Sequence, residues 1–235
     1  MKAVLLAAGR GTRLEPLTHS IPKILAPLDG RPLLDHQLRY LAANGVTEVA
    51  INVHHHARQV QRFLDRAGAP LRIHMSYEAE LLGTAGALVP LRGFLDETFV
   101  VLYGDVVTDT SLPRLVAAHR RAGALATLAC VRDELSAAKG LVEVGDSGRV
   151  LSFREKVAMP VEGAVVNAGI YILEPEVLNE IEVGFSDFGH DVWPRLVAVG
   201  ADLRAVVIRD YVRDIGSPEA LRDARADLVG GVSRW

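Results

Sequence analysis

The sequence predicts a three-layer α/β fold in which a mixed, mainly parallel sheet has helices on both faces. In the first half of the chain, short apolar runs alternate with segments of helical periodicity, as in a parallel sheet with crossover helices. Glycines follow most of these helical segments, where helices commonly end. The second half is richer in strands, which makes the predicted sheet mixed rather than purely parallel.

The first half contains four predicted strands and four predicted helices. The strands are the apolar runs 2–7, 48–53, 71–76 and 99–103. The helices between and after them are 32–43, 57–67, a short one at 84–91, and 112–122. Pro32 suits a first helical turn, while Gly45, Gly68 and Gly123 stand just past helix ends.

The second half continues with strands at 126–131, 141–144, 150–153, 168–173 and 203–208. Its predicted helices are 175–181, 191–199 and 218–228. We find no long linker, low-complexity stretch or internal repeat. We therefore expect one domain over residues 1–235. No hexapeptide repeat follows the last predicted helix, so no C-terminal β-helix domain is expected.

Composition narrows the class of protein. The 235 residues are 49% hydrophobic and 23% charged, with a net charge of -3, which is typical of a soluble globular protein without a basic field for nucleic acid. No apolar run has the length of a membrane span or a signal peptide. The single cysteine, Cys130, excludes an internal disulfide and is expected in a buried strand. We expect a cytoplasmic protein.

A glycine-rich loop follows the first strand. It reads Gly9-Arg10-Gly11-Thr12-Arg13 and stands where an open α/β sheet exposes its ligand-binding edge. Glycines there let backbone N–H groups approach phosphate oxygens, and Arg13 and Lys23 could hold a triphosphate from two sides. The alternative is a tight turn with two solvated cations. The loop matches neither a dinucleotide fingerprint nor a P-loop.

These residues belong to a longer series of motifs. The series comprises G-x-G-T-R-L at 9–14, Pro22-Lys23, Leu33-Leu34, L-G-T-A-G at 82–86, Gly104-Asp105, F-R-E-K at 153–156, N-A-G-I-Y at 167–171 and D-I-G-S-P at 214–218. In content and order it resembles the nucleotidyltransferase family of sugar-nucleotide pyrophosphorylases, including compact mannose- and manno-heptose-1-phosphate guanylyltransferases. The resemblance implies a Rossmann-like fold of the nucleotide-diphospho-sugar transferase type, with a nucleotide-binding half of about 1–125 and a sugar-binding half of about 126–235.

The resemblance also implies roles for individual residues. Arg13 and Lys23 would be catalytic. The nucleotide-binding residues would be Ala7, Ala8, Gly9, Gly11, Thr12, Glu78, Gly83 and Thr84, and the sugar-phosphate-binding residues Gly140, Glu155, Lys156 and Asn167. Val157 replaces the family's proline after this lysine, a departure that affects the turn more than the chemistry.

Two aspartates are candidate metal ligands. Asp105 follows a strand and Asp214 stands at the start of a predicted turn. The resemblance implies that they share one Mg²⁺, an ion that suits one or two carboxylates plus phosphate oxygens. Taken singly, each is equally well explained as a cap or turn residue. Asp109 is a weaker alternative to Asp105.

Glu78 is the candidate for recognising the base. In uridylyl and thymidylyl relatives a glutamine commonly stands here. An ionised carboxylate only accepts hydrogen bonds, which suits the adjacent N1–H and N2–H donors of guanine and opposes the carbonyls of uracil. This favours GTP. Cytosine and adenine also carry an amino group, Glu80 is a second candidate, and both glutamates could instead face solvent.

Two further motifs are assigned no chemistry. Three consecutive histidines, His54 to His56, cannot converge on one ion from a strand, so we interpret them as a strand-to-helix junction. The segment 186–191, S-D-F-G-H-D, contains the D-F-G of kinases, but the sequence lacks the other kinase motifs. We interpret it as a helix-capping loop, and a role near the sugar is open.

The sequence thus predicts a sugar-1-phosphate nucleotidyltransferase that converts a nucleoside triphosphate and a sugar 1-phosphate into a nucleotide sugar and pyrophosphate. GTP and a mannose- or manno-heptose-type 1-phosphate are favoured. The alternatives are a uridylyl- or cytidylyltransferase of the same family, a metal-dependent glycosyltransferase, or a non-catalytic nucleotide-sugar-binding subunit. No nucleic-acid or membrane partner is expected, and a homo-oligomer is left open.

Overall fold

The computed structural model describes residues 1–68, 70–132, 140–155 and 165–230. The chain divides into two compact units, each made of discontinuous segments. Unit 1 comprises Met1–Leu81, Leu102–Thr110 and Asp210–Trp235, and unit 2 comprises Leu82–Val101 and Ser111–Arg209. The expectation of one domain, with ligand-binding halves that divide near residue 125, stays a prediction.

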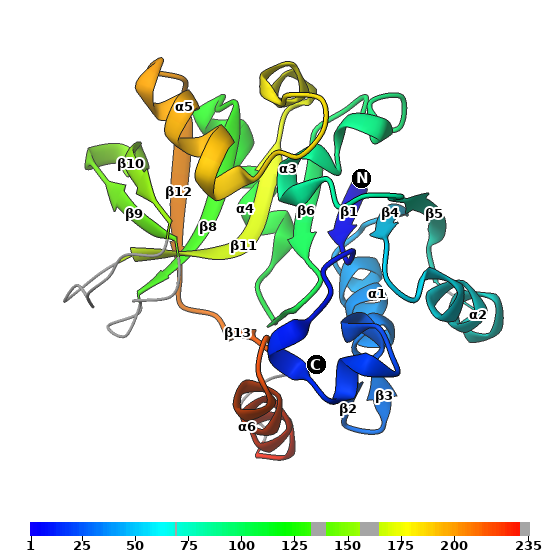
Figure 1. The fold of residues 1–235 in the computed structure, drawn as a ribbon. Coiled ribbons are helices and arrows are strands. Elements are labelled where there is room, and N and C mark those ends of the chain that lie inside the picture. The colour runs from blue at the N-terminus through cyan, green and yellow to red at the C-terminus, as the bar shows by residue number, and fades with distance from the viewer. Residues whose placement is uncertain (69, 133–139, 156–164, 231–235) are drawn as a thin grey trace. The chain divides into compact units, whose positions relative to one another are not determined.

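Unit 1 is built on a parallel sheet. The strands β1 (Lys2–Leu6), β4 (Glu48–Val53) and β5 (Arg72–Tyr77) pair in parallel in the order β1-β4-β5, side by side in Figure 1. The end of β6 (Phe99–Tyr103) lies next to β1. Parallel strands end at the same edge of a sheet, so the residues that follow β1, β4, β5 and β6 meet there.

The helices of unit 1 are α1 (Leu33–Ala43), α2 (Ala57–Ala67) and α6 (Pro218–Val229). Short 3-10 helices occur at Thr12–Leu14, Leu17–His19 and Lys23–Leu25. The Ser217 hydroxyl caps α6 by accepting from the Ala220 N–H, and proline begins the helix. Leu221 and Ala224 of α6 pack with Leu14 in a buried cluster.

Two small antiparallel ladders in unit 1 were not predicted. They join β2 (Pro27–Leu28) to β3 (Arg31–Pro32) and β7 (Val106–Thr108) to β13 (Val212–Asp214). Strands of two or three residues are too short to show an alternating pattern of polar and apolar side chains. The second ladder matters for the site described below.

Unit 2 has a mixed sheet. Its strands are β8 (Ala126–Arg132), β9 (Leu141–Val144), β10 (Val150–Arg154), β11 (Val165–Leu173) and β12 (Leu203–Ile208), together with the start of β6. β8 runs parallel to β12 and antiparallel to β11, which in turn pairs with β9. The prediction of a strand-rich second half is confirmed.

Helices cover both faces of the unit 2 sheet. Neighbouring residues of a strand point to opposite faces, and Thr127 of β8 contacts His119 of α4 (Leu112–Ala122). The adjacent Leu128 pairs with Tyr171 of β11, whose ring contacts Trp193 of α5 (Trp193–Ala198) on the other face. The prediction of an α/β fold with helices on both faces is confirmed.

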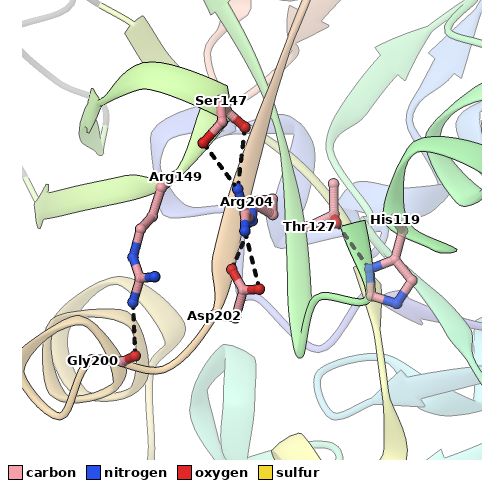
Figure 2. A network of polar contacts seen from close by, with 7 residues as sticks. All are labelled: His119, Thr127, Ser147, Arg149, Gly200, Asp202 and Arg204. Carbon is pink, nitrogen blue, oxygen red and sulfur yellow. Dashed lines mark hydrogen bonds and ion pairs between the residues drawn. The ribbon is translucent and has the colours of Figure 1, made fainter. Parts of the chain in front are cut away.

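Hydrogen bonds tie the outer strand of unit 2 to its turns (Figure 2). The Arg204 guanidinium on β12 donates to both oxygens of Asp202, at 2.6 and 3.1 Å, and to the backbone oxygen of Ser147. Arg149 donates to the Gly200 carbonyl. These contacts hold the turn after β9 against β12.

Three predicted helices differ from those observed. The 84–91 helix is divided into α3 (Gly83–Gly86) and a 3-10 helix, Val89–Leu91. The 175–181 helix is a 3-10 helix, Pro175–Glu180. In place of 191–199, a π-helical turn (Phe188–Val192) precedes α5, because Asp187 caps the chain earlier than expected. No helix in the described part of the chain has the length and apolar character needed to cross a membrane.

Candidate active site

Gly11 closes the glycine-rich loop over Lys23. Gly11 has a φ of 67°, in the left-handed region that favours glycine. A β-carbon there would lie 2.9 Å from Thr18 Cγ2 and 3.0 Å from Lys23 Cβ, and the Thr18 hydroxyl donates to the Gly11 carbonyl at 2.9 Å. The fold of the loop therefore requires Gly11, because it brings the loop backbone against the lysine.

Lys23 and Asp105 form a close ion pair. The Lys23 Nζ lies 2.5 Å from Asp105 Oδ2, and the side chains are only 13% and 25% exposed. Asp105 directly follows Gly104, whose N–H donates to the Leu6 carbonyl of β1 at 2.8 Å. A β-carbon on Gly104 would collide with that carbonyl oxygen. Glycine thus allows the end of β6 to approach the end of β1, which places Asp105 beside the glycine-rich loop.

The β7–β13 ladder brings Asp214 to the same place. Asp214 is the last residue of β13 and pairs with Val106, while the Ile215 N–H donates to the Asp105 carbonyl at 2.9 Å. The expectation that Asp214 begins a turn was wrong: it ends a strand. The register of that strand, which the sequence did not reveal, aligns the two aspartates.

Asp214 lies in an electrostatically strained position. Its Oδ1 is buried and has no hydrogen-bond partner among the residues that the structure describes. Burial raises the pKa of the Asp214 carboxyl and the negative charge of Asp105 raises it further, whereas the positive charges of Lys23 and Arg13 and a hydrogen bond from the Gly216 backbone lower it. A buried carboxylate of this kind needs a cation or a proton nearby.

Arg13 completes the cluster. A β-carbon at Gly216 would lie 2.8 Å from Asp214 Oδ1 and 2.9 Å from Arg13 Nη2, so the guanidinium and the carboxylate both border this glycine. Arg13, Lys23, Asp105 and Asp214 therefore lie together within unit 1. This cluster combines two carboxylates with two positively charged side chains. It lies at the carboxyl edge of the unit 1 sheet, where a phosphate group and its metal could bind.

Glu78 is buried, not solvent-facing. It is 3% exposed, and its Oε1 accepts a hydrogen bond from Asn52 Nδ2 at 2.7 Å. The Oδ1 of Asn52 in turn accepts from the Ala7 N–H at 2.6 Å. The alternative in which Glu78 faces solvent is excluded, whereas Glu80 is exposed. Sequence reasoning missed Asn52, whose signal was a single amide within the apolar run of β4.

The other predicted contacts of the loop are placed as follows. Ala8 is buried, Gly9 and Thr12 are exposed, and the Ala7 N–H is committed to Asn52. Backbone donors nearer the tip of the loop are thus better placed for phosphate than that of Ala7.

Gly83 and Thr84 belong to unit 2 and have local structural roles. A β-carbon on Gly83 would collide with the Ser186 carbonyl oxygen. The Thr84 hydroxyl donates to Asp187 Oδ2 at 2.8 Å and accepts from the Phe188 N–H at 2.9 Å. The Oδ1 of Asp187 accepts from two following backbone N–H groups, which confirms segment 186–191 as a helix-capping loop.

Three of the predicted sugar-binding residues lie together in unit 2. The Asn167 N–H donates to the Gly140 carbonyl at 2.9 Å, and a β-carbon on Gly140 would lie 2.8 Å from Glu155 Oε2. The Asn167 amide donates to the Tyr171 hydroxyl and accepts from the Gly169 N–H. Glu155 also borders Gly189 of the capping loop. Lys156 lies outside the described residues.

The remaining sequence features are structural. His54 to His56 connect β4 to α2, as predicted. Asp109 accepts from the Tyr211 N–H at 2.8 Å, as suits a turn residue. Cys130 is buried in β8, and burial raises the pKa of its thiol to about 12, so it is not a nucleophile.

The fold and this cluster define the class of protein. The chain belongs to the nucleotidyl transferase family, whose model matches residues 2–230. It is 38% identical to the UTP–glucose-1-phosphate uridylyltransferase of a Synechocystis species, with 92% of this chain and 60% of the relative aligned. It is 36% identical to mannose-1-phosphate guanylyltransferase 1 of Arabidopsis thaliana, over 93% of this chain and 62% of the relative. The chain thus spans about 60% of the length of these relatives.

A solved structure has the same fold. HddC from Yersinia pseudotuberculosis, complexed with GMP-PN, superposes with a TM-score of 0.83 at 23% identity, covering 97% of this chain and 99% of that one. At this identity the likeness concerns the fold.

Proposed function

We propose that the protein is a sugar-1-phosphate nucleotidyltransferase, which converts a nucleoside triphosphate and a sugar 1-phosphate into a nucleotide sugar and pyrophosphate. The observation that carries the proposal is the meeting of Arg13, Lys23, Asp105 and Asp214 in one partly buried cluster. The names of the relatives, which include sugar-1-phosphate uridylyl- and guanylyltransferases, support it.

In this reaction an oxygen of the sugar phosphate attacks the α-phosphorus in line and pyrophosphate leaves. No side-chain nucleophile is needed, so the protein contributes position and charge. Arg13 and Lys23 would bind the triphosphate and stabilise the charge on the leaving pyrophosphate. Lys23 is held by Asp105 at 2.5 Å, so its ammonium is already oriented at the end of the glycine-rich loop.

The residues present fit a divalent cation. Asp214 has a buried oxygen without a hydrogen-bond partner in the described chain, and Asp105 lies close enough to raise its pKa. We propose that these two carboxylates hold Mg²⁺, which would neutralise charge at the α-phosphate. They are the only ligands that we assign, in keeping with the small number of protein ligands that Mg²⁺ takes at phosphate sites.

We place the sugar 1-phosphate at Gly140, Glu155, Lys156 and Asn167. Glu155 offers a carboxylate for sugar hydroxyls, and the bonds from Asn167 to Tyr171 and Gly169 fix its amide. Mannose or a manno-heptose is the favoured sugar. The cytoplasmic location stays a prediction, which fractionation of the host cells would test.

For the base we favour guanine over uracil. Glu78 presents a carboxylate, and a carboxylate accepts the adjacent N1–H and N2–H of guanine but is opposed by the carbonyls of uracil. UTP is the main alternative, because one of the relatives bears a uridylyltransferase name. Hydrolysis of, or glycosyl transfer from, a nucleotide sugar would instead indicate a glycosyltransferase, and binding without turnover a non-catalytic subunit.

Pyrophosphate release tests the proposal. The protein would be assayed with each of GTP, UTP, CTP and ATP against mannose-, manno-heptose-, glucose- and N-acetylglucosamine 1-phosphate, with and without Mg²⁺. We expect release that depends on both substrates and is greatest with GTP. Activity with UTP but not GTP would refute the guanine preference alone, and no release from any pair would refute the reaction.

A further inference from the structure

Asn52 is a buried amide that joins two parts of the proposed nucleotide site. It stands near the end of β4, between β1 and β5, and is 3% exposed. Its Oδ1 accepts from the Ala7 N–H at 2.6 Å, and its Nδ2 donates to Glu78 Oε1 at 2.7 Å. It thus connects the start of the glycine-rich loop to the carboxylate proposed to recognise the base.

The Ala7 N–H allows this amide only one orientation. A backbone N–H can only donate, so the amide oxygen must face Ala7 and the NH₂ must face residue 78. In the flipped orientation the Asn52 NH₂ would face the Ala7 N–H, which is also a donor, and the Asn52 oxygen would face the Glu78 carboxylate, which is also an acceptor. Leaving such buried groups unsatisfied costs about 1–3 kcal/mol each. Asn52 therefore requires an acceptor from whatever side chain stands at position 78.

The backbone of Glu78 is fixed independently of Asn52. Its N–H donates to the Val53 carbonyl at 2.8 Å, which continues the pairing of β4 with β5. Its carbonyl accepts from His54 Nδ1 at 2.9 Å. The main chain of Glu78 is thus held on both sides, and the Asn52 amide holds the Oε1 atom of its side chain.

We infer that Asn52 is a positioning residue that sets the hydrogen-bonding polarity shown to the base. The inference rests on the proposed function. A carboxylate has about four lone-pair sites, and after one is given to Asn52 a glutamate still offers only acceptors, which suits guanine. A glutamine at position 78 would give its carbonyl oxygen to Asn52 and keep its NH₂ for the base, which suits a uracil carbonyl. Residues 52 and 78 would thus act as one specificity-determining pair.

Three variants test this inference: Glu78→Gln, Asn52→Asp, and the double variant. In Glu78→Gln, a donor replaces the acceptor toward the base. In the double variant, the new aspartate accepts from both the Ala7 N–H and the NH₂ of the new glutamine, so the amide turns and its oxygen becomes the acceptor toward the base. Asn52→Asp alone places two carboxylates side by side and is expected to weaken GTP binding.

The measured quantity is the ratio of kcat/KM for GTP to that for UTP, together with the Kd of each nucleotide from calorimetry. We expect Glu78→Gln to lower the GTP/UTP ratio about tenfold or more, and the added Asn52→Asp to raise it again by a similar factor. Asn179→Asp, an exposed residue of unit 2, is the matched control and should leave the ratio unchanged. Thermal melting of each variant reports on the fold.

The possible results separate the two proposals. Recovery of the ratio in the double variant supports the positioning role, because a merely structural role would reduce GTP and UTP equally. Equal ratios in Glu78→Gln and the double variant overturn the inference while leaving the reaction intact. A wild type that neither binds GTP or UTP nor releases pyrophosphate overturns both.

Discussion

Two ion pairs of nearly equal length, one in each unit, have opposite surroundings. In unit 2, Arg204 lies 2.6 Å from Asp202, donates to both of its oxygens, and also bonds the Ser147 backbone. In unit 1, Lys23 lies 2.5 Å from Asp105, but next to a second carboxylate, Asp214, whose buried Oδ1 has no hydrogen-bond partner in the part of the chain that the structure describes. The distance between the charged atoms therefore does not distinguish the proposed ligand site from the structural contact, and the difference between them is the carboxylate beside Lys23 and Asp105.

The same contrast holds for the polar residues of the two units. In unit 2, Thr84 and Asp187 have their hydrogen bonds satisfied by neighbouring groups of the capping loop. Such residues form a fixed frame. In unit 1 the cluster carries a carboxyl group whose pKa is raised by burial and by Asp105. A fold that keeps such a group reduces its own stability, which is expected where a ligand later supplies the missing charge.

Removal of a cation from the unit 1 cluster should lower turnover strongly. We expect Arg13→Ala or Lys23→Ala to lower kcat about 100- to 1000-fold, as loss of a charge-stabilising donor typically does. Pyrophosphate release under saturating substrates measures it. Arg39→Ala, on the exposed side of α1, is the control and should retain activity. Near-normal turnover in either site variant would contradict the mechanism.

Neutralising Asp214 should separate activity from stability. Since the environment disfavours its charged form, Asp214→Asn should remove turnover and yet raise the apparent melting temperature. The rise would be about 2–4 °C if the relieved penalty is about 1 kcal/mol. Mg²⁺ should stabilise the wild type with nucleotide present and the variant much less. A variant that melts below the wild type would indicate that the carboxylate is structurally satisfied.

The four residues of the unit 1 cluster were identified from the sequence alone. Arg13, Lys23, Asp105 and Asp214 each stand in a short local motif, and it is the order of these motifs along the chain that resembles the family; of the four, Asp105 directly follows a glycine at a strand end. The β7–β13 register that aligns the aspartates joins residues about a hundred positions apart through three-residue strands, so it left no periodic signal. Asn52 was missed for a related reason: its meaning depends on Ala7 and Glu78, which only the parallel sheet brings to it.

Loss of a hydrogen bond in the capping loop of unit 2 should lower the stability of the protein. In Thr84→Val the hydroxyl that joins Asp187 Oδ2 to the Phe188 N–H is lost at similar side-chain volume. We expect the free energy of unfolding to fall by about 1–3 kcal/mol, the cost of leaving such groups unsatisfied. Chemical denaturation measures it. An unchanged midpoint would show that the capping loop does not depend on this contact.

The smallest effect is expected at the ion pair of unit 2. Asp202 is 36% exposed and Arg204 is 22% exposed, so water screens the pair and can replace the guanidinium when it is removed. Arg204→Ala should change the free energy of unfolding by about 0–1 kcal/mol, the usual range for such pairs, and should not alter pyrophosphate release. The counterpart in unit 1, Asp105→Ala, removes an acceptor of similar geometry but should abolish activity. A similar loss of turnover in Arg204→Ala and Asp105→Ala would contradict the distinction between the two ion pairs. Whether the neighbouring polar groups have hydrogen-bond partners would then not predict which ion pair takes part in function.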